Sequence, residues 1–519
     1  MTSSAGQVGA GLAAARDARP IQPGERIHVV GAAGAGASAA ALLAARAGAI
    51  VSACDAGGPS PYTGALEALG MTIQASHSPT HVSAPPRPDR LAVTKALTAI
   101  DPDNPELAEA RRAGIPLEPW QQVIADAAVG RVLVGVAGTH GKSTTAGWLV
   151  HVLVEAGEDP AAFVGALLPA SVTGGPPATA RWGRGPAFVV EADEYAGNFD
   201  PYRPQLAILT SAEWDHPDVF ADRGAVVDAF EAWLRHAPAS ATVVANVADE
   251  GVAAVLERLV DWPGSLIAYA LVDQAPQRLG GYARAIADRF PTAGGRTKAL
   301  LGRVAASDSG STSLEIHGLD PLAGGVAARL TTAGRHNAAN ALAVAGAAMA
   351  LGLPPAAIAA GLGSFSGVGR RLQYLGEAAG VSVYDDYGHH PTAIRETIAA
   401  VRQREPGRRI WAAFEPLTFH RTAAMLDALA DALAAADVVA IADIWAGRDP
   451  DTTIASAVAL ADAVVSRRPG IVVIAPGSVE ATADAIAGHV RAGDAVLVMG
   501  GGHSYRIGER LLARLGADG

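Results

Sequence analysis

The sequence predicts an α/β protein built from three domains, and three observations support this fold class. The chain has 519 residues, which is too long for a single hydrophobic core. Short apolar runs alternate with helix-like stretches, a pattern typical of mostly parallel sheets with helices on both faces. Glycine-rich turns connect several of these runs to the helices that follow. We expect a disordered lead-in at residues 1–25. Three domains follow, at residues 26–130, 131–364 and 365–519.

The first domain shows a doubly wound α/β pattern. We expect strands at 27–30, 49–54 and 91–93, and helices at 37–47 and 105–113. A turn containing Gly31, Gly34 and Gly36 joins the first strand to the first helix, and Asp55 follows the second strand. This is similar to a dinucleotide fingerprint, in which glycines admit a diphosphate and an acid binds a ribose. The spacing is G-x-x-G-x-G, however, and a tight strand-to-helix turn often needs glycine in any case.

The second domain opens with a predicted phosphate-binding segment, called the phosphate loop below. It follows an apolar strand, precedes a helix and consists of Gly138, Thr139, His140, Gly141, Lys142, Ser143, Thr144 and Thr145. Glycines let backbone N–H groups approach phosphate oxygens, Lys142 reaches the terminal phosphates, and Ser143 can hold Mg²⁺. An ordinary glycine turn is the alternative. Lys142 is one of only three lysines in an arginine-rich chain, which favours the functional interpretation.

Acidic residues and a histidine follow two later strands of this domain. Glu191 follows the strand at 187–190, and His216 lies shortly after the strand at 206–210. Carboxylates at this edge, next to the phosphate loop, suit Mg²⁺, which prefers oxygen ligands. We expect the two strands to be neighbours, which makes His216 a metal ligand beside Glu191 and Ser143. The alternatives are a solvated acidic loop and a hydrogen-bonded structural histidine.

An alanine-rich helix later in this domain begins with two asparagines. Asn337 and Asn340 share one face of its first turn, where carboxamides can pair with an adenine edge. Helix capping explains one asparagine but not both. The uncharged stretch at 337–369 is broken by Pro354-Pro355, which predicts two short buried helices rather than a membrane span. Residues 262–330 show only short strand-like pieces, and we expect a small side sheet there.

The third domain alternates clearly between strands and helices. We expect its strands at 381–384, 410–414, 438–441, 471–474 and 495–499. Arg371 lies at the hinge before them and can reach a transferring phosphate or pair with surface acids. The segment after the first strand pairs acids with histidines and includes Asp386, Tyr387 and His389, which we interpret as positioning residues for substrate and nucleotide. Arg421, after the second strand, adds an arginine to the same cleft.

Composition argues against several functional classes. The formal net charge of −11 argues against a nucleic-acid-binding surface. The N-terminus lacks the basic and apolar regions of a signal peptide, and no transmembrane helix is expected. Cys54 is the single cysteine, which excludes an internal disulfide and suits a reducing cytoplasm. A free buried thiol is its expected state.

Four motifs, taken in order, resemble those of the Mur ligase family of peptidoglycan synthesis, and the resemblance covers nearly all of the chain after residue 25. They are the phosphate loop and the segments 191–194, 334–342 and 385–392. The resemblance implies a UDP-binding Rossmann-like domain, a central ATP-binding P-loop domain and a C-terminal Rossmann-like domain. It is closest to the alanine-adding members. It implies an ATP- and Mg²⁺-dependent cytoplasmic ligase that joins L-alanine to the carboxylate of UDP-N-acetylmuramate through an acyl phosphate.

The resemblance also implies a role for each candidate residue. The residues implied for phosphate and Mg²⁺ are Lys142, Ser143, Glu191 and His216. Those implied for adenine are Asn337 and Asn340. Those implied for the UDP moiety are Gly31, Gly34, Gly36 and Asp55. Those implied to contact the nucleotide or amino acid from the third domain are Arg371, Asp386, Tyr387 and His389. In this chemistry Lys142 and Arg371 neutralise the transferring group, and His389 or a nearby acid accepts the proton of the amine.

Two features leave the acceptor open. Leu417-Thr418 stands where the alanine-adding pattern has a His-Arg pair, and Phe414-Glu415-Pro416 resembles ligases that attach a recycled tripeptide to UDP-N-acetylmuramate. A muropeptide ligase is therefore the first alternative. A nucleotide-binding regulator without turnover is the second, and the intact Lys142 and Glu191 argue against it. We expect a monomer or a weak homodimer, with no nucleic-acid or membrane partner.

Overall fold

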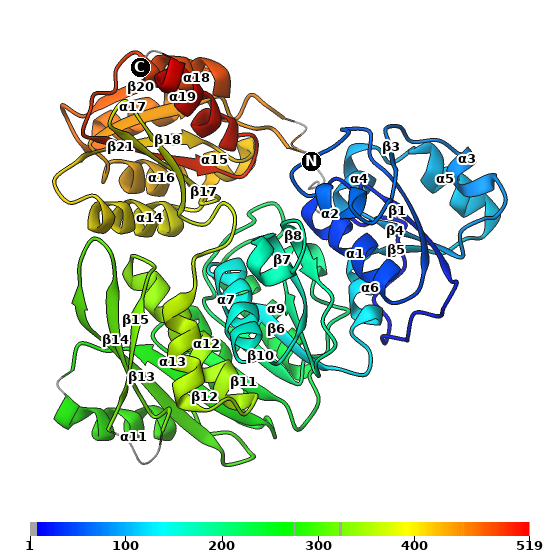
Figure 1. Cartoon of the computed structure of the whole chain (residues 1–519), viewed down its shortest axis with the longest axis horizontal. Helices are drawn as coiled ribbons and strands as arrows, with labels where there is room; N and C mark the ends of the chain where they lie inside the picture. The colour runs from blue at the N-terminus through cyan, green and yellow to red at the C-terminus, as the bar shows by residue number, and fades with distance from the viewer. Residues whose placement is uncertain (1–7, 275, 321–323, 448, 450, 518–519) are drawn as a thin grey trace.

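Three separate sheets, of five, ten and six strands, divide the chain into three α/β domains (Figure 1). The computed structural model describes residues 8–274, 276–320, 324–447, 449 and 451–517. The predicted fold class is confirmed. The exact boundaries near residues 130 and 364 stay a prediction.

The N-terminal domain is a parallel sheet with the strand order β3-β2-β1-β4-β5, which is Rossmann-like. Its strands are β1 (Arg26–Val30), β2 (Ile50–Cys54), β3 (Ile73–Gln74), β4 (Arg90–Val93) and β5 (Leu117–Pro119). Its helices are α1 (Ala35–Arg46), α2 (Gly64–Glu67), α3 (Thr80–Ser83), α4 (Lys95–Ile100), α5 (Pro105–Ala113) and α6 (Trp120–Ala127).

Helix α5 illustrates how local sequence fixes an element. The side-chain oxygen of Asn104 accepts a hydrogen bond from the backbone N–H of Glu106 at 3.1 Å, and Pro105 occupies the first turn. Gly114 ends the helix in the left-handed region, with φ 67°. Because the cap fixes the start of the helix, Glu106 lies in its first turn and its side chain is buried in the domain.

Residues 8–25 are not a disordered lead-in, which corrects the prediction for this part; residues 1–7 lie outside the described residues. The guanidinium of Arg16 donates to Glu118 at 2.9 Å and to Asp126 at 2.7 Å. The fully buried Arg90 binds the same two acids. Arg16 therefore fastens residues 8–25 to the N-terminal domain. Its partners lie about a hundred residues away in the chain, so no local sequence pattern indicates this contact.

The central domain contains the ten-stranded sheet, with the order β15-β14-β13-β12-β11-β10-β6-β9-β7-β8. Its strands are β6 (Val132–Ala137), β7 (Ala161–Leu168), β8 (Ala178–Arg181), β9 (Ala187–Glu191), β10 (Leu206–Leu209), β11 (Thr242–Asn246), β12 (Ser265–Leu271), β13 (Thr297–Ser307), β14 (Thr312–His317) and β15 (Val326–Leu330). Its helices are α7 (Lys142–Glu155), α8 (Ala170–Thr173), η2 (Tyr195–Gly197), α9 (Arg223–Arg235), α10 (Glu250–Arg258), η3 (Pro276–Arg278), α11 (Leu279–Arg289), α12 (Arg335–Ala350) and α13 (Pro355–Ser364).

Two predictions for this domain have different outcomes. The pair of buried helices joined at Pro354-Pro355 is confirmed, as α12 and α13. The small side sheet expected within 262–330 is wrong. Strand β12 pairs in parallel with β11, and β13 with β12, so the ladder of the main sheet continues without a break into the antiparallel strands β14 and β15.

The C-terminal domain has six strands in the order β16-β17-β21-β18-β19-β20, of which only β16 is antiparallel to its neighbour. Its strands are β16 (Gln373–Ala378), β17 (Val381–Asp386), β18 (Arg409–Glu415), β19 (Val438–Ala442), β20 (Val472–Gly477) and β21 (Asp494–Gly500). Its helices are α14 (Pro391–Arg404), α15 (Phe419–Ala424), α16 (Leu426–Leu433), α17 (Ala457–Arg467), α18 (Val479–Ala487) and α19 (Tyr505–Ala517).

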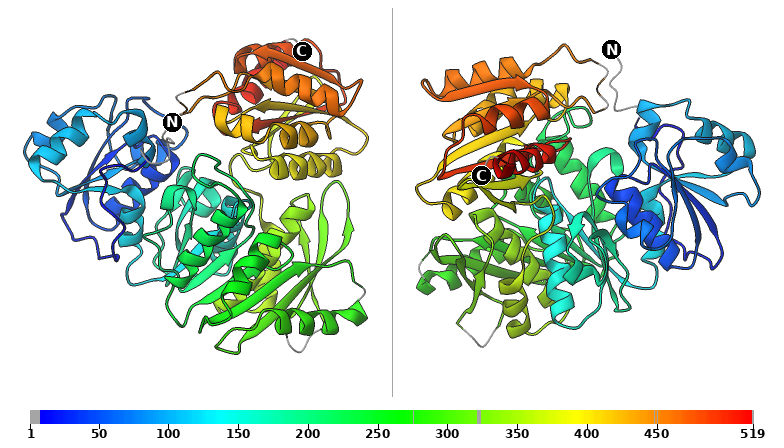
Figure 2. Two further views of the ribbon diagram at one scale, coloured as in Figure 1. Left: turned by 180° about the vertical axis from the view of Figure 1, so that it is seen from behind. Right: turned by 45° about the horizontal axis from the view of Figure 1, so that its top comes forward.

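Both outer domains contact the central one, which lies between them (Figure 2). From the N-terminal domain, Lys95 donates to the carbonyl of Ala196 at 2.7 Å. From the C-terminal domain, the hydroxyl of Thr392 donates to Glu213 at 2.7 Å. Among the described residues, no helix combines the length and the apolar character needed to cross a bilayer.

Candidate active site

The phosphate loop has a shape that only glycine permits at two positions. Gly138 has φ 135°, and a Cβ there would lie 2.2 Å from the hydroxyl oxygen of Thr210. Gly141 has φ 80°, and a Cβ there would lie 2.6 Å from the side-chain oxygen of Asn340. Because the backbone is bare at these points, the N-terminus of α7 is accessible for close approach by an anion.

The rest of the loop is fastened to the end of strand β10. The hydroxyl of Thr139 donates to the carbonyl of Glu213 at 3.0 Å and accepts from the N–H of the same residue at 2.9 Å. The N–H of His140 donates to the hydroxyl of Ser211 at 2.8 Å. These contacts set the loop in place before any ligand binds, which is what a preorganised anion site requires.

Lys142 projects from the first turn of α7 into a group of acids. Its ammonium lies 3.0 Å from Glu194 and 3.3 Å from Asp193. Burial lowers the pKa of Lys142, but the two carboxylates outweigh burial, and the net pKa lies above its ordinary value. Lys142 is therefore a fixed positive charge beside the phosphate loop.

Ser143 connects the central domain to the C-terminal one. Its hydroxyl donates to Glu191 at 3.0 Å and accepts from the guanidinium of Arg371 at 2.8 Å. The second carboxylate oxygen of Glu191 accepts from the N–H of Gly165 at 2.6 Å. The hinge arginine thus reaches the phosphate loop. Its contact with a transferring phosphate stays a prediction.

The structure corrects the expected surroundings of His216. Strands β9 and β10 are not neighbours, because β6 lies between them in the sheet. Ligand atoms of His216 come within 4.8 Å of those of Asp193 and Glu194, whereas Glu191 pairs with Ser143. We call Asp193, Glu194 and His216 the acidic cluster. Its carboxylates, with Glu191 and Ser143, provide the oxygen donors that Mg²⁺ prefers, so the residues fit this ion.

Arg421 joins the two domains rather than facing open space. Its guanidinium donates to Asp215 at 2.8 Å and lies 3.1 Å from Nδ1 of His216. Its side chain is only 6% exposed. Burial raises the pKa of Asp215, yet His216 and Arg421 outweigh burial and lower the net pKa well below its ordinary value. Arg421 is therefore an interdomain contact, and its predicted contact with substrate stays a prediction.

His389 belongs to the same junction. Its Nδ1 lies 2.9 Å from the carbonyl oxygen of Tyr387, so this nitrogen carries the proton, and Nε2 lies 4.0 Å from Asp215. Burial, and then the charge of Arg421, lowers the pKa of His389 well below its ordinary value. His389 is therefore a neutral imidazole at pH 7, with the lone pair on Nε2.

The other predicted residues of the third domain shape the hinge. The carboxylate of Asp386 accepts from the N–H groups of Leu372 and Gly388, each at 2.7 Å. The guanidinium of Arg371 lies 5.2 Å from the ring centre of Tyr387. Asp386 thus holds the hinge backbone, and Tyr387 supports the arginine that reaches the phosphate loop.

The two asparagines of α12 lie together as predicted. The side-chain nitrogen of Asn340 lies 3.4 Å from the side-chain oxygen of Asn337, and Asn337 donates to the carbonyl of Ala333 at 2.7 Å. Both line a cavity of about 1460 Å³ that residues of all three domains surround. Of the predicted residues, those in the cavity wall are Gly34, His140, Gly141, Thr144, Asn337, Asn340, Arg371, Asp386 and Tyr387.

The glycines of the first domain's turn have different roles: one lines the cavity, and two allow close packing. Gly34 lies in the cavity wall. A Cβ on Gly31 would lie 2.8 Å from the hydroxyl oxygen of Thr94, and one on Gly36 would lie 2.2 Å from the ring of Trp120. Asp55 accepts from the N–H of Ala33 at 2.9 Å, so it holds the turn.

Sequence reasoning assigned no role to two residues of the site, Tyr62 and Arg370, which line the cavity. Asp193 belongs to the acidic segment that the sequence predicts for Mg²⁺, and in the structure it binds Lys142. Tyr62 lies in the Gly- and Pro-rich segment after β2, a composition that marks a functional loop and that could have identified it. Arg370 binds Asp385, whereas its neighbour Arg371 reaches Ser143. The local sequence does not indicate which of the two adjacent arginines makes which contact.

Comparisons with known proteins agree with this architecture. Family models match in three parts: "Mur ligase family, catalytic domain" at residues 26–131, "Mur ligase middle domain" at 136–348, and "Mur ligase, glutamate ligase domain" at 370–502. A UDP-N-acetylmuramate–L-alanine ligase of Frankia casuarinae is 35% identical, over 95% of this chain and 98% of its own. The same-named protein of Kineococcus radiotolerans is 36% identical, over 94% and 95%.

Solved structures show the same fold. The crystal structure of a UDP-N-acetylmuramate–alanine ligase from Thermotoga maritima matches with a TM-score of 0.74 and 23% identity, over 95% of this chain and all of its own. A murein peptide ligase from Psychrobacter arcticus matches with a TM-score of 0.68 and 24% identity, over 95% and 99%. With its three matched domains and its near-full-length relatives, this chain belongs to the Mur ligase family, whose members are ATP-dependent ligases.

Proposed function

We propose that this enzyme joins L-alanine to the carboxylate of UDP-N-acetylmuramate, with ATP cleaved to ADP and phosphate. The observation that carries the proposal is the convergence of three domains on one cavity, whose wall includes Gly34, three residues of the phosphate loop (His140, Gly141 and Thr144) and the hinge arginine Arg371. Support for the substrates comes from relatives of this name that are 35% and 36% identical over nearly the whole chain. We also propose that the enzyme acts in the cytoplasm as a monomer or weak homodimer.

The first step activates a poor acyl donor. An oxygen of the sugar carboxylate attacks the γ-phosphorus of ATP, the bond from that phosphorus to the bridging oxygen breaks, and ADP leaves. Negative charge gathers on the transferring group in this step. Lys142 and Arg371, whose guanidinium donates to Ser143, supply positive charge, and the bare backbone of Gly138 and Gly141 admits the phosphates.

Mg²⁺ would be held by Ser143, Glu191 and the acidic cluster, where it would supply positive charge to the phosphate oxygens. In the structure the carboxylates of Asp193 and Glu194 bind the ammonium of Lys142. Phosphate oxygens are anions of the same kind, so Lys142 has suitable partners both with and without the nucleotide. The protein therefore keeps this charge in place between turnovers.

The second step forms the amide. The neutral amine attacks the acyl carbon, the bond to the phosphate oxygen breaks, and inorganic phosphate leaves. His389 has its lone pair on Nε2 and is the candidate to accept the proton that the amine loses. Arg421 and Thr392 hold the C-terminal domain against the central one. Closure of the domains over the cavity would exclude water from the acyl phosphate.

A muropeptide ligase with a tripeptide acceptor is the second candidate. Leu417 and Thr418 are the positions predicted to face the acceptor, and Leu417 bridges to Trp445, a residue of the cavity wall. A hydrophobic and a hydroxyl side chain offer no charge to the carboxylate of free alanine. The hypothesis of a regulator without turnover has no such support, because Lys142, Glu191 and Arg371, the charged groups proposed for phosphoryl transfer, are present.

Phosphate release separates these candidates. Purified enzyme is incubated with ATP, Mg²⁺ and UDP-N-acetylmuramate, and the amine is varied. Release that depends on L-alanine supports the main proposal, and release that depends on the tripeptide L-alanyl-γ-D-glutamyl-meso-diaminopimelate supports the second. Absence of release with either amine, at saturating concentrations of all components, contradicts both.

A further inference from the structure

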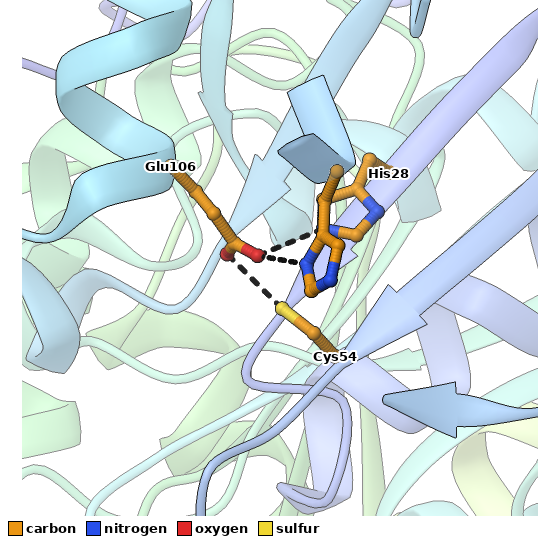
Figure 3. Close-up of side chains that lie close together, drawn as sticks. His28, Cys54 and Glu106 are labelled. Carbon is orange, nitrogen blue, oxygen red and sulfur yellow. Dashed lines mark hydrogen bonds and ion pairs between the residues drawn. The ribbon is translucent and has the colours of Figure 1, made fainter. Parts of the chain in front are cut away.

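A second group of potential metal ligands lies inside the N-terminal domain, away from the phosphate loop. Its members are His28 on β1, Cys54 at the end of β2, His81 on α3 and Glu106 on α5, and we call them the histidine–cysteine cluster. One ligand atom from each lies within 4.8 Å of those of the others. Figure 3 shows the side chains of His28 and Cys54 converging on the carboxylate of Glu106.

The cluster is buried and contains a nitrogen without a hydrogen bond. The side chains of His28 and Glu106 have no exposed surface, and that of His81 is 9% exposed. Nε2 of His28 has no hydrogen-bond partner among the residues that the structure describes, and its distance to Glu106, 3.6 Å, is too long for one. Nε2 of His28 is thus a buried polar atom that faces a carboxylate and a thiol but forms no hydrogen bond. Such an atom calls for an explanation.

The contacts crowd around one carboxylate. The thiol of Cys54 lies 3.0 Å from one oxygen of Glu106, and Nδ1 of His81 makes a short contact with the other. Burial raises the pKa of Glu106, but its interactions with His28 and Cys54 outweigh burial and bring the pKa down to about 2. Glu106 is thus a carboxylate at neutral pH. One sulfur, two imidazole nitrogens and a carboxylate oxygen form a donor set that zinc takes in proteins.

We propose that the histidine–cysteine cluster binds one zinc ion, as a structural site with four protein ligands. All four positions are filled by the protein, which is typical of structural rather than catalytic zinc. The bound ion would give Nε2 of His28 the partner that it lacks. Metal binding would also convert the Cys54 thiol to a thiolate, whose proton leaves to solvent.

Two neighbours have the positions expected of supporting groups. Nδ1 of His28 lies 2.8 Å from the hydroxyl of Ser52, which fixes the ring so that Nε2 faces the cluster. His77 lies 3.1 Å from Glu106, and its side chain, 15% exposed, is the most accessible of the histidines at this site. The segment carrying His77 therefore offers the metal a route from solvent.

The site would stabilise the part of the domain that faces the cavity. The carbonyl of Cys54 accepts from the N–H groups of Gly31 and Ala32, at 2.9 Å and 3.0 Å. Zinc bound to the Cys54 side chain would therefore fix the start of the glycine turn. Strands β1 and β2 and helices α3 and α5 each contribute a ligand, so one ion would tie together four elements of the domain.

The test measures metal on the full chain. Protein prepared with zinc and desalted is analysed for metal content, and we expect one zinc per chain. Cys54→Ser and His81→Gln should lose nearly all of it, whereas His489→Gln, an exposed histidine of the C-terminal domain, should keep it. Ser52→Ala should bind zinc about tenfold more weakly in a chelator competition, because it removes only a supporting contact.

Two measurements on the unmodified sequence guard against variants that fail to fold. Zinc-free protein titrated with Co²⁺ should develop a thiolate-to-cobalt charge-transfer band, which requires Cys54 as ligand. Its melting temperature should rise when Zn²⁺ is added and should not rise with Mg²⁺ alone. The proposal is overturned if the desalted protein contains no zinc, if cobalt produces no charge-transfer band, or if Cys54→Ser keeps the zinc content of the unmodified protein.

Discussion

The acidic cluster and the histidine–cysteine cluster are both groups of metal-ligating side chains, yet they differ in chemistry and surroundings. The first combines two carboxylates with His216 and has the ammonium of Lys142 within 3.3 Å. The second contains a thiol and two imidazoles around one carboxylate, and it lies within a single domain. Oxygen donors beside a phosphate loop suit an exchangeable ion shared with a nucleotide, whereas a closed set with sulfur suits a permanent one.

The two clusters are also held in different ways. The acidic cluster lies at a junction of domains, where Arg421 of the C-terminal domain contacts His216. Motion of that domain would change its surroundings during turnover. The histidine–cysteine cluster takes all its ligands from the N-terminal domain. A change in one cluster should therefore leave the other largely unaffected, and the predictions below test this separation.

The largest effect is expected from Lys142→Ala. Removing this charge should lower kcat/KM by about 10³-fold, because it stabilises the transferring phosphoryl group. Affinity for the UDP-sugar should stay within about twofold, since a single distant charge contributes little to binding in another domain. Steady-state kinetics and calorimetric binding of UDP-N-acetylmuramate check both expectations.

Lys298→Ala is the matched control for this variant. Lys298 is exposed on β13, so its removal should leave the kinetics unchanged. A Lys142→Ala protein that loses UDP-sugar binding together with turnover would show that the two regions are not independent.

Omitting Mg²⁺ should distinguish the two metal sites directly. Turnover should fall at least about 100-fold, because a metal at the phosphates contributes several kcal/mol. Adding Mg²⁺ should restore turnover, and adding Zn²⁺ should not. Zinc content, measured on the same samples, should stay constant throughout. Loss of zinc in step with loss of activity would contradict the separation.

Glu415 offers a third buried carboxylate for comparison, with a pKa displaced in the opposite direction to that of Glu106. Burial raises the pKa of Glu415 to about 7, and its Oε2 has no hydrogen-bond partner among the described residues. A raised pKa stabilises the fold at low pH, and this contribution disappears as the pH rises through about 7. Between pH 5 and pH 8 the protein should therefore lose about 2 kcal/mol that Glu415→Gln does not lose.

Chemical denaturation at the two pH values measures this difference. Glu257→Gln, at an exposed glutamate of α10, is the control and should follow the unmodified protein. Equal pH dependence in the unmodified protein and Glu415→Gln would show that Glu415 is ionised in the fold at pH 5.

The smallest effect is expected at the acceptor side. Leu417→His with Thr418→Arg should change KM for the amine about fivefold, the value of one hydrogen bond, and KM for ATP by less than about twofold. Leu417→Met, which adds no polar group, is the control. Equal changes in both KM values would argue against an acceptor role for these positions.

The sequence predicted the features that depend on short segments. A strand, a glycine turn and a helix suffice to define the phosphate loop, and Pro354-Pro355 suffices to separate α12 from α13. The sequence places Asn337 and Asn340 together because residues three positions apart in a helix lie on the same face.

Features that depend on strand order or on distant residues were not predictable. The sequence predicts His216 beside Glu191 because β9 and β10 follow one another in the chain, but β6 lies between them in the sheet. The histidine–cysteine cluster draws on positions 28, 54, 81 and 106, a spacing that matches no short metal motif. Only the fold brings these four side chains together.

The most direct test of the account follows the oxygen of the sugar acid. UDP-N-acetylmuramate labelled with ¹⁸O in its carboxylate is turned over with ATP, Mg²⁺ and the amine, and the phosphate is analysed by mass spectrometry. An acyl phosphate formed at the phosphate loop predicts one ¹⁸O atom in each phosphate released. Phosphate without the label during productive turnover would contradict the account.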